Sequence, residues 1–123
     1  MNKRTVGGRY EEAAAEYLEK CGLTIVERNF RCRMGEIDLI ALDKDPEDGG
    51  RIFVFIEVKY RRNAHAGSPW EAVGYAKRKT ICRVAQFYRL RFGGLAGCRF
   101  RFDVISILGD EITWFKNAFP YTE

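Results

Sequence analysis

Hydrophobic positions near the start of the chain recur with a helical period. Between residues 8 and 20 they fall three and four residues apart, at Tyr10, Ala13, Ala14, Tyr17 and Leu18. This spacing predicts an amphipathic helix over 8–20, which Gly22 ends. The same period returns over 70–92 and predicts a second, longer helix that Gly93 and Gly94 close. Each helix has one apolar face and therefore needs a partner layer.

Shorter apolar runs, rich in β-branched and aromatic residues, predict five strands. They cover residues 23–30, 36–42, 51–60, 99–108 and 111–115, with turns at 34–35 and 109–110 and a polar loop at 43–50. The run over 51–60, RIFVFIEVKY, is largely apolar on both of its faces. We therefore expect this strand in the middle of a sheet that is covered on both sides.

The predicted order is helix, three strands, helix, two strands. The first three strands can form an antiparallel meander, and the long second helix allows a crossover to a strand parallel to one of them. The sequence therefore predicts an α/β fold in which helices flank a mixed β-sheet. With 123 residues, 46% of them hydrophobic, the chain fits one domain over 1–123.

The composition argues against several classes of protein. No apolar run approaches the roughly 20 residues of a membrane span, and none follows the basic residues at the N-terminus, so we expect a cytoplasmic protein without a membrane partner. The four cysteines, at 21, 32, 82 and 98, lack the paired spacing of a zinc site. In a cytosolic chain we expect them to be reduced, partly buried thiols. The only histidine, His65, lies in a polar stretch, which argues against a catalytic Cys–His pair.

Charge is distributed unevenly between the two halves of the chain. Residues 1–58 carry nine Lys or Arg and twelve Asp or Glu, whereas residues 59–123 carry twelve and five. The balance is −3 in the first part and +7 in the second. A basic half favours a polyanionic partner, and an acidic half leaves carboxylates for a cation. An ordinary solvated surface explains the asymmetry equally well.

One group of charged residues falls where the sheet should be most buried. Glu57 and Lys59 are two residues apart, so they share a strand face, while Val58 points to the opposite layer. Asp38 lies in the preceding strand. Because side chains alternate along a strand, Ile37 and Leu39 should both face the side of the sheet opposite to Asp38. If the hairpin pairs these strands, Asp38 and Glu57 meet beside Lys59. A buried salt-bridge cluster is the alternative interpretation.

Two carboxylates held close together repel each other unless a proton or a cation lies between them. Oxygen ligands on rigid strands suit Mg²⁺ or Mn²⁺, with waters completing the coordination. Such a cation can acidify a water molecule and hold a phosphate oxygen, which phosphodiester hydrolysis requires. Lys59 would then orient the attacking water or neutralise charge that builds on the phosphate.

The surrounding residues resemble the motifs of a known family. Residues 35–41, GEIDLIA, and 55–59, FIEVK, followed by Arg61, look like the signature of the YraN-like family. That family is a bacterial group of predicted nucleases in the restriction-endonuclease-like, or PD-(D/E)XK, superfamily, distantly similar to archaeal Holliday junction resolvases. The resemblance extends over nearly the whole chain, and its further matches are Tyr17, Leu18, Gly22, the stretches 28–31, 71–73 and 101–104, and Lys77.

The resemblance implies a restriction-endonuclease-like core of order α-β-β-β-α-β and an endonuclease that depends on Mg²⁺ or Mn²⁺. The catalytic residues expected from it are Glu11, Asp38, Glu57 and Lys59. The expected metal-binding residues are Asp38, Glu57 and Val58. Glu11 is matched by its seven-residue distance from Leu18, but Glu12 could face the site instead, because the family usually has Gly where this chain has Tyr10.

Basic residues offer contacts for a nucleic acid. Lys77 falls within the apolar sector of the second predicted helix, so it either snorkels to the edge or reaches the scissile phosphate. The residues expected to contact DNA phosphates are Arg61, Arg62, Lys77, Arg78, Lys79 and Arg83. Trp70 could stack on a base, although a core position is the simpler role for it.

Two hypotheses of function follow. The first is a nuclease that hydrolyses DNA phosphodiester bonds, including those of branched structures. The second is a nucleic-acid-binding module with little turnover that acts in DNA processing with a partner. The intact Asp38, Glu57 and Lys59 favour the first, because binding alone needs no buried pair of carboxylates. A homodimer is left open, because resolvases of this kind commonly cut two strands as dimers.

Overall fold

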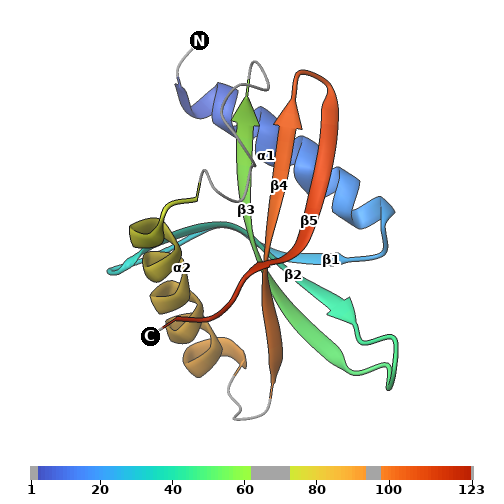
Figure 1. Ribbon diagram of the computed structural model, residues 1–123, viewed down its shortest axis with the longest axis vertical. Coiled ribbons are helices and arrows are strands. Elements are labelled where there is room, and N and C mark those ends of the chain that lie inside the picture. Colours follow the sequence, from blue (N-terminus) through green and yellow to red (C-terminus); the bar gives the residue numbers. More distant parts are fainter. Residues whose placement is uncertain (1–2, 62–72, 94–97, 123) are drawn as a thin grey trace.

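The computed structural model of the chain describes residues 3–61, 73–93 and 98–122, and Figure 1 shows one sheet with a helix on each side. The helices are α1 (Lys3–Lys20) and α2 (Tyr75–Tyr88). The strands, in their order across the sheet, are β1 (Thr24–Cys32), β2 (Gly35–Lys44), β3 (Arg51–Arg61), β4 (Arg99–Leu108) and β5 (Glu111–Phe119). The predicted α/β class and the predicted order of elements are confirmed.

The sheet is mixed in the way that the element order predicts. β1, β2 and β3 form an antiparallel meander, β4 lies parallel to β3, and β5 returns antiparallel to β4. α2 lies in the crossover between β3 and β4. The central position of β3 confirms the interpretation of its apolar run, because residues 54–57 are all buried.

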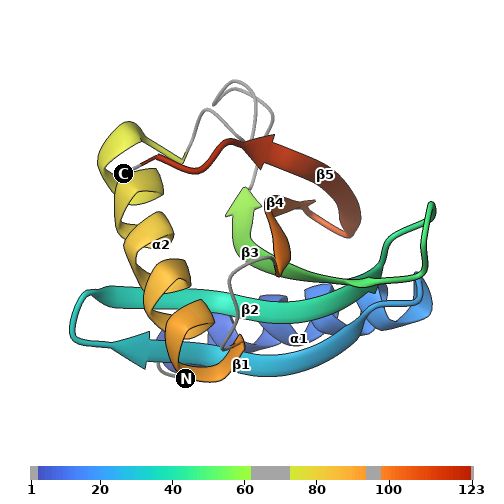
Figure 2. The same ribbon diagram turned by 90° about the horizontal axis from the view of Figure 1, so that it is seen from below.

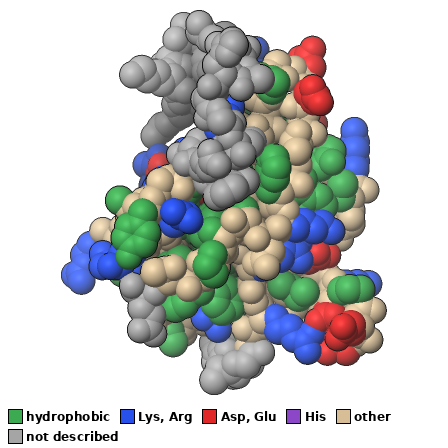
Figure 3. Space-filling model, in the orientation of Figure 1, with side chains coloured by type: hydrophobic (Ala, Val, Ile, Leu, Met, Phe, Trp, Pro, Cys, Tyr) green, Lys and Arg blue, Asp and Glu red, His purple; other side chains and the backbone are tan. Residues whose placement is uncertain are grey.

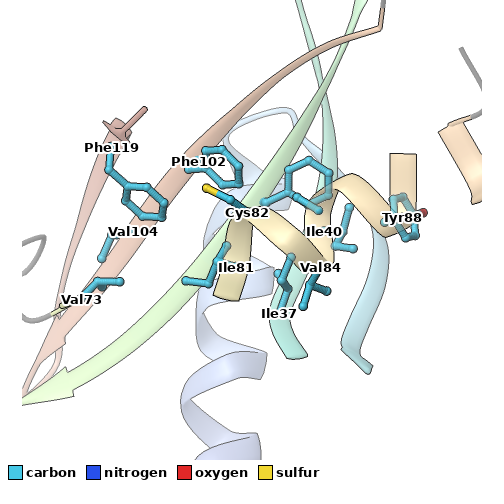
Figure 4. Close-up of a cluster of buried hydrophobic side chains, with 12 residues drawn as sticks. Ile37, Ile40, Val73, Ile81, Cys82, Val84, Tyr88, Phe102, Val104 and Phe119 are labelled. Carbon is cyan, nitrogen blue, oxygen red and sulfur yellow. The ribbon is translucent and has the colours of Figure 1, made fainter. Parts of the chain in front are cut away.

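Two hydrophobic cores lie on opposite faces of the sheet, one under each helix, and Figure 2 shows the sheet between them. The core under α1 joins Leu18 to residues of the sheet such as Leu39, Ile56 and Ile105. The core under α2, drawn in Figure 4, contains Ile37, Ile40, Val73, Ile81, Cys82, Val84, Tyr88, Phe102, Val104 and Phe119. Each helix thus buries its apolar face as expected.

Several element boundaries differ from the prediction. α1 begins at Lys3 rather than at residue 8. β2 continues to Lys44, because Lys44 pairs with Arg51, so the loop predicted over 43–50 shortens to 45–50. The Asp45 N–H closes this loop by donating to the Gly50 carbonyl at 2.7 Å. β5 runs to Phe119 instead of ending at residue 115.

The second helix is shorter than its hydrophobic period suggests. α2 begins at Tyr75, after Gly74 in an extended conformation (φ −63°, ψ 165°), so the prediction that it starts at Trp70 is wrong at residues 73 and 74. Residues 70–72, including Trp70, lie outside the described residues. After Tyr88 the helix continues as one π-helical turn, η2 (Arg89–Gly93).

The alternation expected around Asp38 is also wrong. Ile37 packs in the core under α2, whereas Leu39 packs in the core under α1. The pairing of β1 with β2 skips Asn29 and Asp38, and Asn29 has a positive φ of 52°. A residue in the left-handed region interrupts the regular pleat, so the strand pair exchanges faces at this point. Asp38 therefore lies at a bend between the two cores.

Two further predictions concern the class of protein. No helix in the described part of the chain is long and apolar enough to cross a membrane. The four cysteines, all within the described residues, are free thiols.

Candidate active site

Asp38 lies where β2 and β3 separate. The two strands pair from Lys44 and Arg51 up to Leu39 and Ile56, and the pairing ends there. One step beyond, the Val58 N–H donates to Asp38 Oδ2 at 2.8 Å instead of to a main-chain carbonyl of β2. The carboxylate of Asp38 is thereby fixed beside β3, next to Glu57.

Glu57 is a buried carboxylate, with 3% of the residue exposed. Its Oε2 atom lies 4.0 Å from the Lys77 ammonium, but its Oε1 atom is buried and has no hydrogen-bond partner in the described part of the chain. Burial, and secondly the charge of Asp38, raise the pKa of Glu57 to about 8, although Lys77 and Lys59 oppose this rise. Without a cation, Glu57 therefore holds a proton near neutral pH.

Glu11 joins these two carboxylates from α1. Burial raises its pKa, followed by the charge of Asp38, while a hydrogen bond with the Asn29 side chain acts in the opposite direction. Glu12 is exposed and forms an ion pair with Arg28 instead. The structure thus places Glu11, and not Glu12, against Asp38. No role was predicted for Asn29, although it lies in the stretch 28–31 that resembles the family and places an amide side chain inside a predicted strand.

Two lysines from different elements lie near Glu57. Lys59 follows on β3, and its charge acts on Glu57 together with that of Lys77 from α2. The Lys77 side chain is 40% exposed, and its ammonium lies 4.0 Å from Glu57 Oε2. Its contact with the scissile phosphate stays a prediction. Three acids and two lysines thus converge from α1, β2, β3 and α2.

The other expected DNA contacts spread along α2 and the end of β3. Arg83 is exposed on α2, whereas Arg78 and Lys79 are half-buried, with the Lys79 ammonium 5.8 Å from the centre of the Tyr75 ring. Arg61 ends β3 and is half-buried. Figure 3 shows Lys and Arg side chains with hydrophobic ones between them on the α2 side of this face. Arg62 and His65 lie outside the described residues.

The donor set can be compared with what different metals need. Within the described residues, no three His, Cys, Asp or Glu form a group that could hold a metal ion. The described residues therefore do not form a closed site of protein ligands such as zinc prefers. Two carboxylates, from Asp38 and Glu57, with a main-chain oxygen and water fit Mg²⁺ or Mn²⁺.

Val58 can complete this set through its main chain. In an extended strand, the N–H and the carbonyl of one residue point towards the same neighbouring strand. The Val58 N–H faces Asp38, so we expect its carbonyl to face the same side, beyond the last paired residues of β2 and β3. The unpartnered Oε1 of Glu57 is the observation that best fits a cation here.

Comparison with known proteins gives the family. A model of the uncharacterised protein family UPF0102 matches residues 10–107, which include every acid and lysine of the site described above. The chain belongs to the UPF0102 family. This confirms the resemblance to the YraN-like family.

Relatives in the UPF0102 family match almost end to end. A UPF0102 protein of Caldicellulosiruptor saccharolyticus is 40% identical, over 97% of this chain and 100% of its own. A UPF0102 protein of Aliivibrio salmonicida is 43% identical, over 95% of this chain and 93% of its own. A UPF0102 protein of Lachnoclostridium phytofermentans is 44% identical, over 97% of this chain and 96% of its own. These names state no activity.

This UPF0102 protein has a second buried carboxylate, Asp103, to which sequence analysis gave no role. It is 1% exposed and accepts hydrogen bonds from Arg101 Nε at 3.0 and 3.1 Å, from Trp114 Nε1 at 2.9 Å and from the Asn117 N–H at 2.8 Å. Arg101 also donates to Asp43 at 2.9 Å. The signal was the spacing of Arg101 and Asp103, two residues apart on one strand face.

Proposed function

We propose that this protein is a metal-dependent nuclease that hydrolyses DNA phosphodiester bonds, including those of branched DNA. The observation that carries the proposal is the buried Oε1 of Glu57, which has no hydrogen-bond partner among the described residues although Asp38 lies beside it. A buried polar atom without a partner is costly, by about 1–3 kcal/mol. A bound cation would satisfy this oxygen and remove the repulsion between the two carboxylates.

Asp38, Glu57 and the main chain of Val58 are the residues that would hold Mg²⁺ or Mn²⁺. When bound, the ion supplies charge stabilisation to the phosphate and favours ionisation of water. The protein's own part is to fix the ligands in advance: the Val58 N–H orients Asp38, and the packed centre of β3 immobilises Glu57. A site that is ordered before the substrate arrives needs little reorganisation during the reaction.

The lysines and Glu11 supply the remaining contacts. Lys59 is placed to donate hydrogen bonds to a phosphate oxygen or to orient the attacking water, and Lys77 adds a second positive charge on the α2 side. Glu11, whose raised pKa reflects its burial beside Asp38, can accept a hydrogen bond from a water molecule in its ionised form. The outward basic residues of α2 would contact phosphates on either side of the cut without reading sequence.

Cleavage of labelled DNA tests the proposal. Duplex, single-stranded, flapped and four-way DNA are incubated side by side with Mg²⁺, with Mn²⁺ and with EDTA. We expect cleavage that requires the metal and falls at least about 100-fold in Lys59→Ala, while DNA binding persists. Lys20→Ala, which removes an exposed lysine from the end of α1, is the matched control and should cleave like the wild type.

Two results would reject the nuclease. One is salt-sensitive DNA binding without cleavage of any of the four substrates, which is what the non-catalytic module predicts. The other is cleavage that persists in EDTA or in Lys59→Ala, because it would arise from a different site or from a contaminant.

A further inference from the structure

A cavity lies between the β1–β2 hairpin and the C-terminal end of α2. It has a volume of about 550 Å³, and three phenylalanines and three arginines form most of its lining: Phe30, Phe87, Phe92, Arg31, Arg33 and Arg91. Met34, at the hairpin turn, adds a side chain that is 42% exposed. We refer to this cavity as the aromatic groove. The proposed nuclease chemistry uses none of its residues.

The walls of the aromatic groove are held in place by close packing. Gly35 lies against α2 so tightly that a Cβ atom would be 2.6 Å from Thr80 Cγ2, and its φ of +148° also disfavours other residues. Phe92 packs at 6.0 Å from the Phe30 ring and at 5.0 Å from the Tyr88 ring, measured between centroids. Even so, Phe92 is 55% exposed, so part of a firmly supported ring is open to solvent.

The π-helical turn η2 carries this exposed ring. Single π-helical turns are rare, and they are frequent at functional sites. Tyr88, the last residue of α2, packs at 5.1 Å against Phe30, which ties the turn to β1. Phe92 is therefore a preformed platform rather than a loose surface side chain.

The charged residues that line the aromatic groove are all positive. The Arg91 guanidinium lies 6.0 Å from the centre of the Phe87 ring and 5.6 Å from that of Phe92. Arg31 is paired with Glu36, but none of the described lining residues is acidic. Aromatic rings for bases, with guanidinium groups for phosphates, are the combination by which proteins bind single-stranded nucleic acids.

We infer that the aromatic groove binds unpaired nucleotides of a DNA strand that continues to the candidate active site. This inference rests on the proposed function, because it takes DNA as the ligand. α2 connects the two places: Lys77 lies near Glu57, and Phe87 follows ten residues later, about 15 Å along the helix. At about 3.4 Å per stacked nucleotide, roughly four or five nucleotides span this distance.

The inference predicts a preference for DNA in which a duplex continues into a single-stranded tail. Fluorescence anisotropy in EDTA, where no cleavage occurs, can measure the affinity for a hairpin duplex with thymine tails of zero to eight nucleotides on either end. We expect the affinity of the wild type to rise once one of the tails exceeds about four nucleotides. Phe92→Ala should bind the tailed DNA about five- to 100-fold more weakly than the wild type does, because it loses the stacking of bases on the ring. Its affinity for the tailless hairpin should stay within about twofold of the wild-type value.

Other variants keep this test interpretable. Arg33→Ala and Arg91→Ala change exposed arginines and should also reduce the gain from the tail, without the loss of ring packing that accompanies Phe92→Ala. Leu90→Ala is the matched control, because Leu90 lies in η2 and is 75% exposed but does not line the groove. It should bind tailed DNA like the wild type.

Three outcomes would overturn the inference. The first is that tails add no affinity in the wild type. The second is that Phe92→Ala, Arg33→Ala and Arg91→Ala bind tailed DNA as the wild type does. The third is that these variants change a dimer into a monomer in light scattering and leave the gain from the tail intact, since the groove would then bind a second copy of the chain.

The outcome for the nuclease is separate. A tail gain that depends on the aromatic groove, in a protein that cleaves no DNA, supports the groove and rejects the nuclease. Metal-dependent cleavage in a protein whose groove variants bind tailed DNA like the wild type supports the nuclease and rejects the groove.

Discussion

Two carboxylates are almost equally buried in this sheet, and their surroundings differ completely. Asp103, on β4, is 1% exposed and accepts hydrogen bonds from Arg101, Trp114 and Asn117. Glu57, on the adjacent β3, is 3% exposed, yet its Oε1 atom has no hydrogen-bond partner in the described residues. The two strands are parallel neighbours, so the difference in hydrogen bonding between the two carboxylates does not come from a difference in burial.

The difference separates an acid that stabilises the fold from one that does not. The contacts of Asp103 with Trp114 and Asn117 join β4 to β5 at the irregular pairing between Phe102 and Val104, where Asn117 has a positive φ of 52°. Glu57 sits beside Asp38 instead, and that charge raises its pKa further. A buried acid with a raised pKa and one carboxylate oxygen that lacks a hydrogen-bond partner in the described residues is what a ligand-binding site would contain.

Removing the charge of Asp103 should have the largest effect on stability. In Asp103→Asn, the Arg101 guanidinium loses one of its two carboxylate partners and keeps Asp43, and one of the acceptor oxygens is replaced by a donor. Breaking a buried ion pair in this way costs about 3–5 kcal/mol. Urea unfolding should therefore show a clear loss of unfolding free energy relative to the wild type. A loss below about 1 kcal/mol would mean that Asp103, like Glu57, contributes little to the stability of the fold.

The same change at Glu57 should act in the opposite direction. Glu57→Gln removes a carboxyl group that must ionise against its surroundings, so at pH 8 in EDTA it should raise the unfolding free energy by up to about 4 kcal/mol, from about 1.4 kcal/mol per pKa unit. The same urea titration measures it. Destabilisation at pH 8 comparable to that of Asp103→Asn would contradict the comparison.

The pH dependence of the wild type follows from the same shift. The pKa of Glu57 is about 8 in the folded chain and 4.5 ordinarily, so the folded state keeps a proton that the unfolded state loses between these values. Stability in EDTA should therefore fall as the pH rises from 4.5 towards 8, and the loss should level off above 8. Glu57→Gln should flatten this decline, which thermal unfolding across the pH range can check.

Lys77 should give the smallest change in stability. Its ammonium is 4.0 Å from Glu57, and its side chain is 40% exposed, so solvent weakens the pair. Lys77→Met should change the unfolding free energy by less than about 1 kcal/mol. It should nevertheless lower DNA cleavage, because one of the two positive charges beside the carboxylates is lost. An unchanged cleavage rate would limit Lys77 to a structural contact.

Much of the fold could be predicted from the sequence, because it follows from local periodicity. The run over 51–60 placed β3 at the centre of the sheet, and the long second helix indicated a parallel crossover. The start of α2 could not be predicted, because residues 73 and 74 continue the helical pattern while Gly74 is extended in the structure. Periodicity shows which face of a helix is apolar, but it does not show at which residue the helix begins.

The sequence indicated which residues form the candidate site, but not the backbone bend beside it or the hydrogen-bond partners of Asp103. The positions of Asp38, Glu57 and Lys59 in the sequence suggested that they converge, and the structure brings them together. The bend at Asn29, which turns Asp38 away from simple alternation, depends on a backbone conformation that few sequence patterns specify. The partners of Asp103 come from β4 and β5 together, so no single-strand pattern could reveal all of them.

Binding of Mn²⁺, followed by electron paramagnetic resonance of the free ion, shows whether Asp38 and Glu57 hold a cation. We expect the wild type to take up Mn²⁺ at pH 8, Glu57→Gln and Asp38→Asn to lose this binding, and folded Lys77→Met to retain it. Equal uptake by the wild type and Glu57→Gln, or no uptake by the wild type, would show that the acids at 38 and 57 do not form a cation site.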